Sequence, residues 1–336
     1  SGIPAVSSGA LTPVELAVIV LTPLAAFEAT GMLPAAAVAV QRSRAAAARI
    51  LALLDSATDP VASEQTVAPA LVSSDVAGGD GAVVRQGIVA RGLACGWPGL
   101  PPVVTGVDLD VAPGRAVAVV GPSGAGKTTL LLTLAGLLPP SAGTLRVDGD
   151  DPAVLSPADR AARVVVTTED AHVFGTTVLE NLRVARGDVT PDEAAQALRT
   201  VGLGRWLAAL PDGLDTMLGP DARTVSGGER RRLLLARALL APAPLLLVDE
   251  PAEHLDPATA DTLVSALLAG PPPPGGGPRG IVVVTHRLTP LAAADEVLWV
   301  QHGRVAARGA HDDLSARLLD YREAVRRERV VAVQQE

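Results

Sequence analysis

Four short apolar runs punctuate the chain, and segments with helical spacing lie between them. The runs are Arg115–Val120, Arg163–Thr167, Leu245–Asp249 and Ile281–Thr285. Continuous apolar strands that alternate with helices are typical of a parallel sheet covered by helices on both faces. The pattern therefore predicts an α/β fold for this part of the chain, which we expect to begin near Val83.

Two longer apolar stretches, Leu16–Phe27 and Ala29–Val40, lie near the N-terminus and are followed directly by arginines at positions 42, 44 and 49. About 20 apolar residues span a bilayer, and arginine-rich flanks tend to stay in the cytoplasm. We therefore predict an α-helical transmembrane segment that continues into the cytoplasm as a helix over Gln41–Asp55.

A buried helix of a soluble domain is the alternative for this region. Glu28 separates the two stretches, and a carboxylate in mid-membrane is costly. Prolines at positions 13, 23 and 34 weaken a continuous helix. Because the chain begins with Ser1 and has no secretory signal, we interpret it as the C-terminal fragment of a longer protein.

Local composition indicates where the linker, the large domain and the C-terminal tail begin and end. Residues 56–82 are rich in Ser, Ala, Asp and Gly without periodicity, which indicates a flexible linker between residues 1–55 and a large domain over residues 83–326. Gly270–Gly280, rich in proline and glycine, is predicted to be a surface loop. We predict an amphipathic helix over His311–Arg329 and a C-terminal tail over residues 327–336.

The net charge bears on the partners that the protein can bind, and the cysteine content bears on disulfides. The 336 residues carry a formal net charge of −8, which argues against the broad basic surface that nucleic-acid binding needs. Nucleic acid is therefore not an expected partner. The single cysteine, Cys95, excludes an internal disulfide and is expected to be a small buried residue.

A glycine-rich loop after the first apolar run is the strongest chemical signal. Residues 121–128, GPSGAGKT, match the pattern GxxxxGK[ST] between a strand and a helix, the context that the pattern requires. Such a loop wraps backbone N–H groups around phosphates at a helix N-terminus, which adds positive potential. The predicted nucleotide-binding residues are Gly121, Ser123, Gly124, Gly126, Lys127, Thr128 and Thr129.

Charged and hydroxyl groups in and near this loop are of the types that bind the phosphates of ATP and Mg²⁺. Lys127, the only lysine of the chain, is expected to bridge the β- and γ-phosphates, and Thr128 to ligate the metal. The run Leu245–Asp249 leads into two carboxylates, Asp249 and Glu250. Because successive strand residues point to opposite sides, Asp249 can face the metal while Glu250 faces the attacking water as general base.

The segment VSGGE at residues 225–229, before an arginine-rich helix, resembles the LSGGQ signature of the ATP-binding cassette (ABC) family. The resemblance covers roughly Val83–Arg326. It implies a P-loop NTPase fold with a RecA-like core, a β-subdomain and a helical signature subdomain. It also implies that Ser226 and the N–H groups of Gly227 and Gly228 contact the γ-phosphate of a nucleotide on an opposing domain, close to the charge of Glu229.

Other segments resemble further motifs of the family. His254-Leu255-Asp256 is similar to the D-loop, which places Asp256 at the seam between two cassettes. His286 matches the switch histidine, which implies contact with the γ-phosphate and with the water that Glu250 activates. Trp97 matches the aromatic residue that stacks on adenine, with core packing as the alternative.

Glu169 replaces the glutamine of the family's Q-loop. The resemblance implies that this residue reaches Mg²⁺ and couples the cassette to the membrane helices. Glu169 and the segment PLAAFEA at residues 23–29 most resemble the CydC-type half of CydDC exporters. That implies an ATPase of the inner (plasma) membrane that exports thiols such as cysteine or glutathione in support of cytochrome bd assembly. The implied partner is a second half-transporter, either a CydD-type half or a fused chain.

Other classes of ATP-binding protein share part of this set of motifs. An ABC exporter half for a lipid or a drug would carry the same motifs and stays open. A soluble ABC ATPase of DNA repair would need long coiled coils or a basic surface, and neither is evident. An importer cassette would lack the attached membrane helix, and a P-loop kinase would lack the serine-glycine-glycine signature.

Overall fold

The computed structural model describes residues 12, 14–19, 21–22, 38–44, 46–48, 51, 87–167, 171–219, 225–253 and 255–333. The chain separates into two units, Ser1–Asp80 and Gly81–Glu336. In the first unit, residues 14–19 and 38–44 are helical. Among the described residues, every helix falls short of the length and apolar character that a membrane span needs. The predicted linker and most of the predicted transmembrane segment lie outside the described residues.

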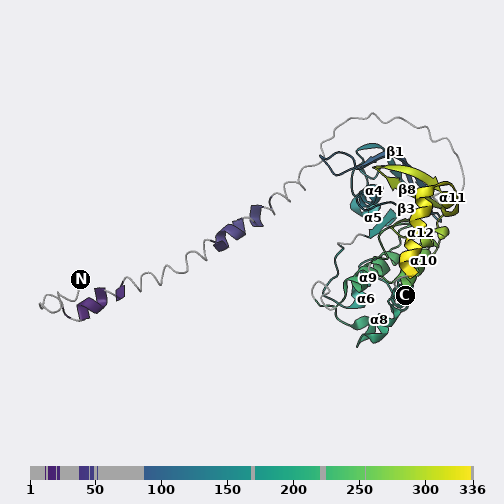
Figure 1. Ribbon diagram of the computed structural model, residues 1–336. Helices are drawn as coiled ribbons and strands as arrows, with labels where there is room; N and C mark the ends of the chain where they lie inside the picture. The colour runs from purple at the N-terminus through teal and green to yellow at the C-terminus, as the bar shows by residue number, and fades with distance from the viewer. Residues whose placement is uncertain are drawn as a thin grey trace, which may run out of the picture. The chain divides into compact units, whose positions relative to one another are not determined.

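The described part of the second unit is built on a nine-stranded sheet (Figure 1). Its strands are β1 (Ile88–Cys95), β2 (Val104–Val111), β3 (Ala116–Val120), β4 (Ala142–Val147), β5 (Val164–Thr167), β6 (Leu245–Asp249), β7 (Gly280–Val284), β8 (Glu296–Gln301) and β9 (Arg304–Gly309). Their order is β4-β1-β2-β9-β8-β3-β7-β6-β5. The neighbours β3, β7, β6 and β5 are parallel and correspond to the four predicted strands, which confirms that prediction.

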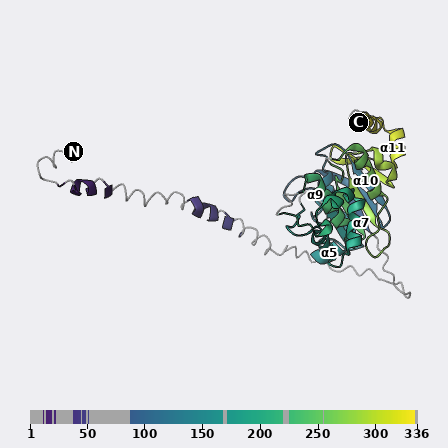
Figure 2. The same cartoon turned by 90° about the horizontal axis from the view of Figure 1, so that it is seen from below.

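Helices surround this sheet. They are α4 (Lys127–Leu134), α5 (Pro157–Arg163), α6 (Val178–Arg183), α7 (Pro191–Thr200), α8 (Gly204–Ala209), α9 (Gly227–Leu239), α10 (Pro257–Leu268), α11 (His311–Arg317) and α12 (Leu319–Val333), with the 3-10 helices η1 (Gly213–Asp215) and η3 (Thr289–Ala293). Helices α5, α6, α7, α9 and α10 each begin at a Ser, Thr or Asp whose side chain accepts a backbone N–H, which explains why they start there. Figure 2 looks onto the side that carries α7, α9 and α10.

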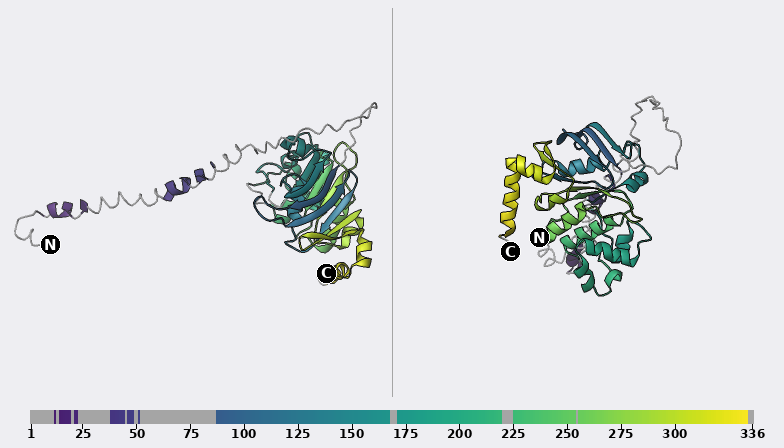
Figure 3. Two further views of the ribbon diagram at one scale, coloured as in Figure 1. Left: turned by 90° about the horizontal axis from the view of Figure 1, so that it is seen from above. Right: turned by 90° about the vertical axis from the view of Figure 1, so that its right-hand side faces the viewer.

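Successive side chains of a strand point to opposite faces of the sheet. Both faces of the parallel strands are buried, because a core lies on each side. In β3, Ala118 and Val120 pack into one core together with residues of α9 and α10, whereas Val117 and Val119 pack into a second core with residues of α4. Cys95 is buried in the second core, as predicted. In the right-hand panel of Figure 3, the blue N-terminal strands lie at one end of this unit and the teal helices at the other.

The C-terminal region corrects one prediction. The single helix expected over His311–Arg329 is two helices, because the chain is extended at Leu318 (φ −109°, ψ 114°). Tyr321 is fully buried; its hydroxyl lies 2.9 Å from Nδ1 of His311, and its ring meets the edge of Trp299. These contacts anchor the start of α12, and α12 then continues through Val333 into the expected tail.

Gly270–Gly280 also differs from its prediction. It is irregular up to residue 279, as expected for a loop, but Arg279 is only 1% exposed. Its guanidinium donates to the carbonyl oxygens of Leu239 (3.1 Å), the last residue of α9, and of Ala241 (2.5 Å), two residues later. Burial lowers the pKa of Arg279 to about 10. The loop therefore ties the end of α9 to the start of β7.

The substitution Arg279→Ala is expected to lower the free energy of unfolding by about 2–4 kcal/mol, because two buried carbonyl oxygens lose their donors. Chemical denaturation measures the change. The matched control is Arg304→Ala at an exposed position on β9, which should change stability by less than about 0.5 kcal/mol. Equal stability of the two variants would contradict this role for Arg279.

Candidate nucleotide-binding site

Three parallel strands deliver the candidate chemical groups to one edge of the sheet. Val119 of β3 pairs with Val284 of β7, and Asp249 of β6 pairs with the same Val284. The carboxyl ends of β3, β6 and β7 therefore lie side by side, as they do where ligands bind in open α/β sheets. The glycine-rich loop, the paired carboxylates and His286 follow these ends, so the structure brings the predicted residues together.

Backbone geometry explains two glycines of the loop. A Cβ on Gly121 would lie 2.2 Å from the carbonyl oxygen of Val300. Gly126 has φ +87° and precedes α4, and a Cβ there would lie 2.5 Å from Cγ2 of Val104. Only glycine fits both positions without displacing a neighbouring strand. The loop can thus turn tightly from β3 into α4.

The remaining loop residues differ in exposure. Ser123 and Gly124 are exposed at the tip of the loop, whereas Thr129 is buried in α4. The side chain of Lys127 is also buried, and Nζ donates to the carbonyl oxygens of Gly121 (3.0 Å) and Pro122 (3.2 Å). Its ammonium group therefore lies inside the curve of the loop, where it is positioned to bind an anion.

A hydroxyl and a carboxylate meet beside this ammonium group. Oγ1 of Thr128 donates to Oδ2 of Asp249 at 2.7 Å. Oxygen ligands of this kind suit Mg²⁺, which usually takes only one or two protein ligands and completes its shell with phosphates and water. Among the described residues, no cluster of three or more His, Cys, Asp or Glu could hold a metal alone. Thr128 and Asp249 thus fit a metal that is shared with a nucleotide.

Glu250 has an unusual backbone. Its φ is +43°, in the left-handed region that non-glycine residues rarely adopt, and its N–H donates to the carbonyl oxygen of Val284 at 2.9 Å. From the sequence, the side chains of Asp249 and Glu250 are expected to point to opposite sides of one regular strand. Instead, the chain turns at Glu250 and directs its carboxylate toward Nζ of Lys127, 4.0 Å away, and toward His286. Strain of this type is concentrated at functional sites.

His286 is the second partner of Glu250. Nδ1 of His286 lies 2.9 Å from Oε2 of Glu250, and the backbone N–H of His286 donates to the same oxygen at 3.3 Å. The hydrogen bond with Glu250 is the main reason that the pKa of His286 is raised; Glu328 adds to the effect, while burial and Arg287 oppose it. Glu250 and His286 thus form one hydrogen-bonded unit, a direct contact that the sequence analysis did not predict.

The signature segment forms the N-terminus of α9. Ser226 caps the helix, and its Oγ accepts the N–H of Glu229 at 3.3 Å. Oε2 of Glu229 in turn accepts the N–H (2.8 Å) and the hydroxyl (2.7 Å) of Ser226. Glu229, which replaces the family's glutamine, therefore completes a capping box. The N–H groups of Gly227 and Gly228 belong to the first turn, where helix N–H groups have no partner within the helix.

Two other predicted residues, Asp256 and Trp97, lie in different surroundings. Asp256 caps α10 by accepting the N–H of Thr259 at 3.0 Å, and this bond lowers the pKa of Asp256. Trp97 is 51% exposed, so core packing does not explain it. Glu169 and His254 lie outside the described residues. The sequence analysis missed an ion pair of 2.6 Å between Arg231 and Glu253, which joins α9 to the loop after Glu250.

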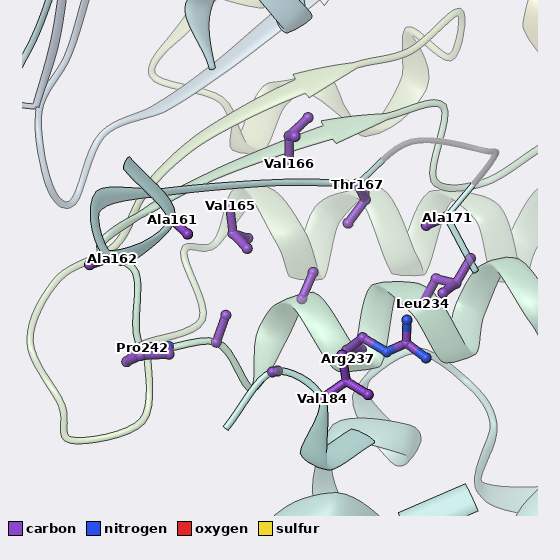
Figure 4. Close-up of a pocket in the computed structure, with 13 residues that line it drawn as sticks. Ala161, Ala162, Val165, Val166, Thr167, Ala171, Val184, Leu234, Arg237 and Pro242 are labelled. Carbon is purple, nitrogen blue, oxygen red and sulfur yellow. The ribbon is translucent and has the colours of Figure 1, made fainter. Parts of the chain in front are cut away.

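A separate apolar cavity of about 430 Å³ is lined in part by residues of β5 and α9 (Figure 4). Val165 and Thr167 of β5 point toward α9, which contributes Leu234 and Arg237. Burial lowers the pKa of Arg237. The catalytic candidates Lys127, Glu250 and His286 do not line this cavity, so it is distinct from the nucleotide edge of the sheet.

Comparison with known proteins identifies the domain. Residues 104–253 match the family model described as "ABC transporter". The second unit is the ATPase domain of an ABC transporter. This finding confirms the family resemblance and, with the sheet described above, the α/β cassette fold.

Relatives of the chain include several transporters. It is 43% identical over 214 residues to the mycobactin import ATP-binding/permease protein IrtB of Mycolicibacterium thermoresistibile, covering 64% of this chain and 36% of that protein. It is 32% identical over 307 residues to the ATP-dependent lipid A-core flippase of Chromobacterium violaceum, covering 91% of this chain and 49% of the relative. The structure of a bacterial Atm1-family ABC exporter with ATP bound superposes with a TM-score of 0.65 at 31% identity, over 73% of this chain and 42% of that one. The chain spans less than half the length of each.

The Glu250→Gln substitution is expected to lower the raised pKa of His286 toward the ordinary value of about 6.5, because the charged acceptor is lost. Protonated His286 stabilises the native state through Glu250. This contribution is fully present below the pKa of the unfolded chain and is lost as pH rises through the raised native pKa. NMR titration of the imidazole measures the shift.

The control is Glu253→Gln, which neutralises a nearby carboxylate that is paired with Arg231. It should leave the pKa of His286 unchanged. An unchanged His286 pKa in the Glu250→Gln protein would contradict the pairing.

Proposed function

We propose that this ATPase domain belongs to an exporter-type half-transporter of the inner membrane, which hydrolyses MgATP to drive transport. The observation that carries the proposal is the position of the Glu250 carboxylate, 2.9 Å from Nδ1 of His286 and 4.0 Å from Nζ of Lys127. A general base, an orienting histidine and a phosphate-binding cation thus share one edge of the sheet. Positioning and electrostatic stabilisation are the main means of catalysing phosphoryl transfer.

Each group has a distinct role in this proposal. The loop amides and Lys127 bind the β- and γ-phosphates, while Thr128 and Asp249 hold Mg²⁺, which neutralises charge on the phosphates. Glu250 orients the attacking water and accepts its proton, and His286 holds the Glu250 carboxylate in place. Trp97, which is exposed, offers its ring to adenine. Glu169 is retained as a predicted contact to the metal.

A second half-transporter completes the site in this proposal. The hydrogen bonds of Ser226 run to Glu229 within α9, and the N–H groups of Gly227 and Gly228 remain at the helix N-terminus. We propose that this end of α9 and Asp256 face the nucleotide of the partner. The partner is either a CydD-type half or a cassette fused to the same chain.

Coupling to the membrane is proposed to use the first unit and Glu169. Apolar residues 16–40 supply the proposed membrane helix, with arginines 42, 44 and 49 on its cytoplasmic side.

Two substitutions separate nucleotide binding from hydrolysis in the assembled transporter. Lys127→Ala is expected to weaken ATP binding, because the phosphates lose their buried cation. Glu250→Gln is expected to keep ATP binding but to lower kcat by roughly a hundredfold or more, because the general base is lost. Equilibrium binding of a fluorescent ATP analogue and steady-state phosphate release measure the two effects. Glu253→Gln is the matched control and should retain both.

Wild-type turnover in the Glu250→Gln protein would contradict the proposed mechanism. Full, concentration-independent hydrolysis by the isolated cassette would contradict a shared site. Either result is separable from misfolding, because a misfolded protein would not bind the ATP analogue.

The cargo proposed from the resemblance to CydC-type halves is a low-molecular-weight thiol. Inverted vesicles that contain the transporter are expected to accumulate labelled glutathione or cysteine when given ATP, and Glu250→Gln vesicles are not. ATP-dependent uptake of a lipid or drug analogue but of neither thiol would contradict thiol export. That outcome would still support an exporter.

A further inference from the structure

We infer that Glu328 of α12 is a positioning residue for His286, so that the C-terminal helix sets the geometry of the hydrolysis site. The inference rests on the proposed function, because it assigns Glu328 a role in ATP hydrolysis. It concerns a contact between residues 40 positions apart in the sequence.

The side chain of His286 is not fixed by packing. It is 62% exposed, and it borders a cavity of about 490 Å³ between the glycine-rich loop and α12. Its polar lining includes Ser123, His286, Asp320, Arg327 and Glu328. The orientation of the imidazole therefore depends on its hydrogen bond with Glu250 and on the backbone that carries it.

Glu328 holds that backbone. Its Oε2 accepts the N–H of Leu288 at 2.7 Å and the N–H of Thr289 at 3.2 Å. These residues begin η3, so their N–H groups have no acceptor within the helix. Leu288 is buried, and an unsatisfied buried N–H is costly. The carboxylate therefore determines where the chain runs two residues after His286.

Arg287 strengthens the same attachment. Its Nε donates to Asp261 of α10 at 2.6 Å, and Nη2 lies 3.6 Å from Oε1 of Glu328. The side chain of Arg287 is 13% exposed and that of Glu328 is 18% exposed, so water screens this pair only partly. The segment after His286 is thus held between α10 and α12.

The position of α12 is itself well determined. Tyr321, Val325 and Glu328 recur at helical spacing on one face, and the first two are buried in the core. Tyr321 contacts His311 and Trp299, which anchors the start of the helix. Glu328 lies two turns farther on and reaches the segment after His286. In Figure 1, α12 is the yellow helix that leads to the C-terminus.

Glu328 acts on catalysis through the backbone that it holds, and its charge in addition raises the pKa of His286. Small misplacements of a catalytic group can lower a rate by about a hundredfold. Loss of Glu328 should therefore reduce kcat and have little effect on ATP binding, which depends on residues 121–128 and Trp97. A merely structural role would weaken both.

The test is steady-state ATP hydrolysis by the assembled, full-length transporter. Glu328→Ala is expected to lower kcat by about tenfold or more, with KM for ATP changed by less than about twofold. Glu328→Gln is expected to keep kcat within about threefold, because its amide oxygen can accept the same two N–H groups. The matched control, Glu323→Ala, removes an exposed carboxylate of the same helix and should resemble wild type.

A second comparison tests whether Glu328 acts through His286. In the His286→Ala background, adding Glu328→Ala should cause no further loss of kcat in single-turnover measurements. Amide exchange at Leu288 and Thr289 should speed up in Glu328→Ala and stay slow in Glu328→Gln.

Three results would overturn the inference: wild-type kcat in Glu328→Ala, equal losses in Glu328→Ala and Glu328→Gln, or a full additional loss in the double variant. A failure of the proposed function would give a different result. In that case His286→Ala itself would hydrolyse ATP at the wild-type rate.

Discussion

The register of three parallel strands is the constraint on which the site depends. β3, β7 and β6 end together because Val119 and Asp249 both pair with Val284. A shift of one residue in either pairing would exchange side chains between the two cores and displace the glycine-rich loop relative to the carboxylates. Burial of both strand faces therefore fixes the fold and the chemistry at the same time.

Opposite charges are concentrated at that edge, and the backbone holds them in place. Lys127 is enclosed by the carbonyl groups of its own loop, and Glu250 is turned toward it by a left-handed backbone conformation. His286 then binds the far side of the Glu250 carboxylate. The three groups form a chain of interactions along this edge of the sheet.

Sequence reasoning predicted the groups whose signals are local. The parallel strands, the glycine-rich loop and the paired carboxylates are each contained in a few consecutive residues. Five strands, β1, β2, β4, β8 and β9, were missed. Four of them are partly exposed or irregular: β1 has register shifts in its pairing with both neighbours, β2 and β4 have exposed positions, and β9 has no fully buried residue. β8 is buried along most of its length, and its apolar run was not recognised.

Features that depend on distant contacts could not be predicted. The break at Leu318 follows from the packing of Tyr321 on Trp299, and the burial of Arg279 follows from carbonyl oxygens at the end of α9. The capping box of Ser226 and Glu229 is an exception, because it is a local signal that the sequence analysis did not use. The contact of Glu328 with Leu288 crosses 40 positions without any periodic signal. Such contacts are visible only when the elements have been placed.

The central claim is that ATP binds with its terminal phosphate among Lys127, Glu250 and His286. A crystal structure of the Glu250→Gln protein with MgATP tests it most directly. The account predicts the β- and γ-phosphates on the amides of residues 121–128, Nζ of Lys127 within hydrogen-bonding distance of them, and Mg²⁺ bound by Thr128 and Asp249. A nucleotide bound elsewhere on the domain, or a triphosphate out of reach of both Lys127 and His286, would contradict it.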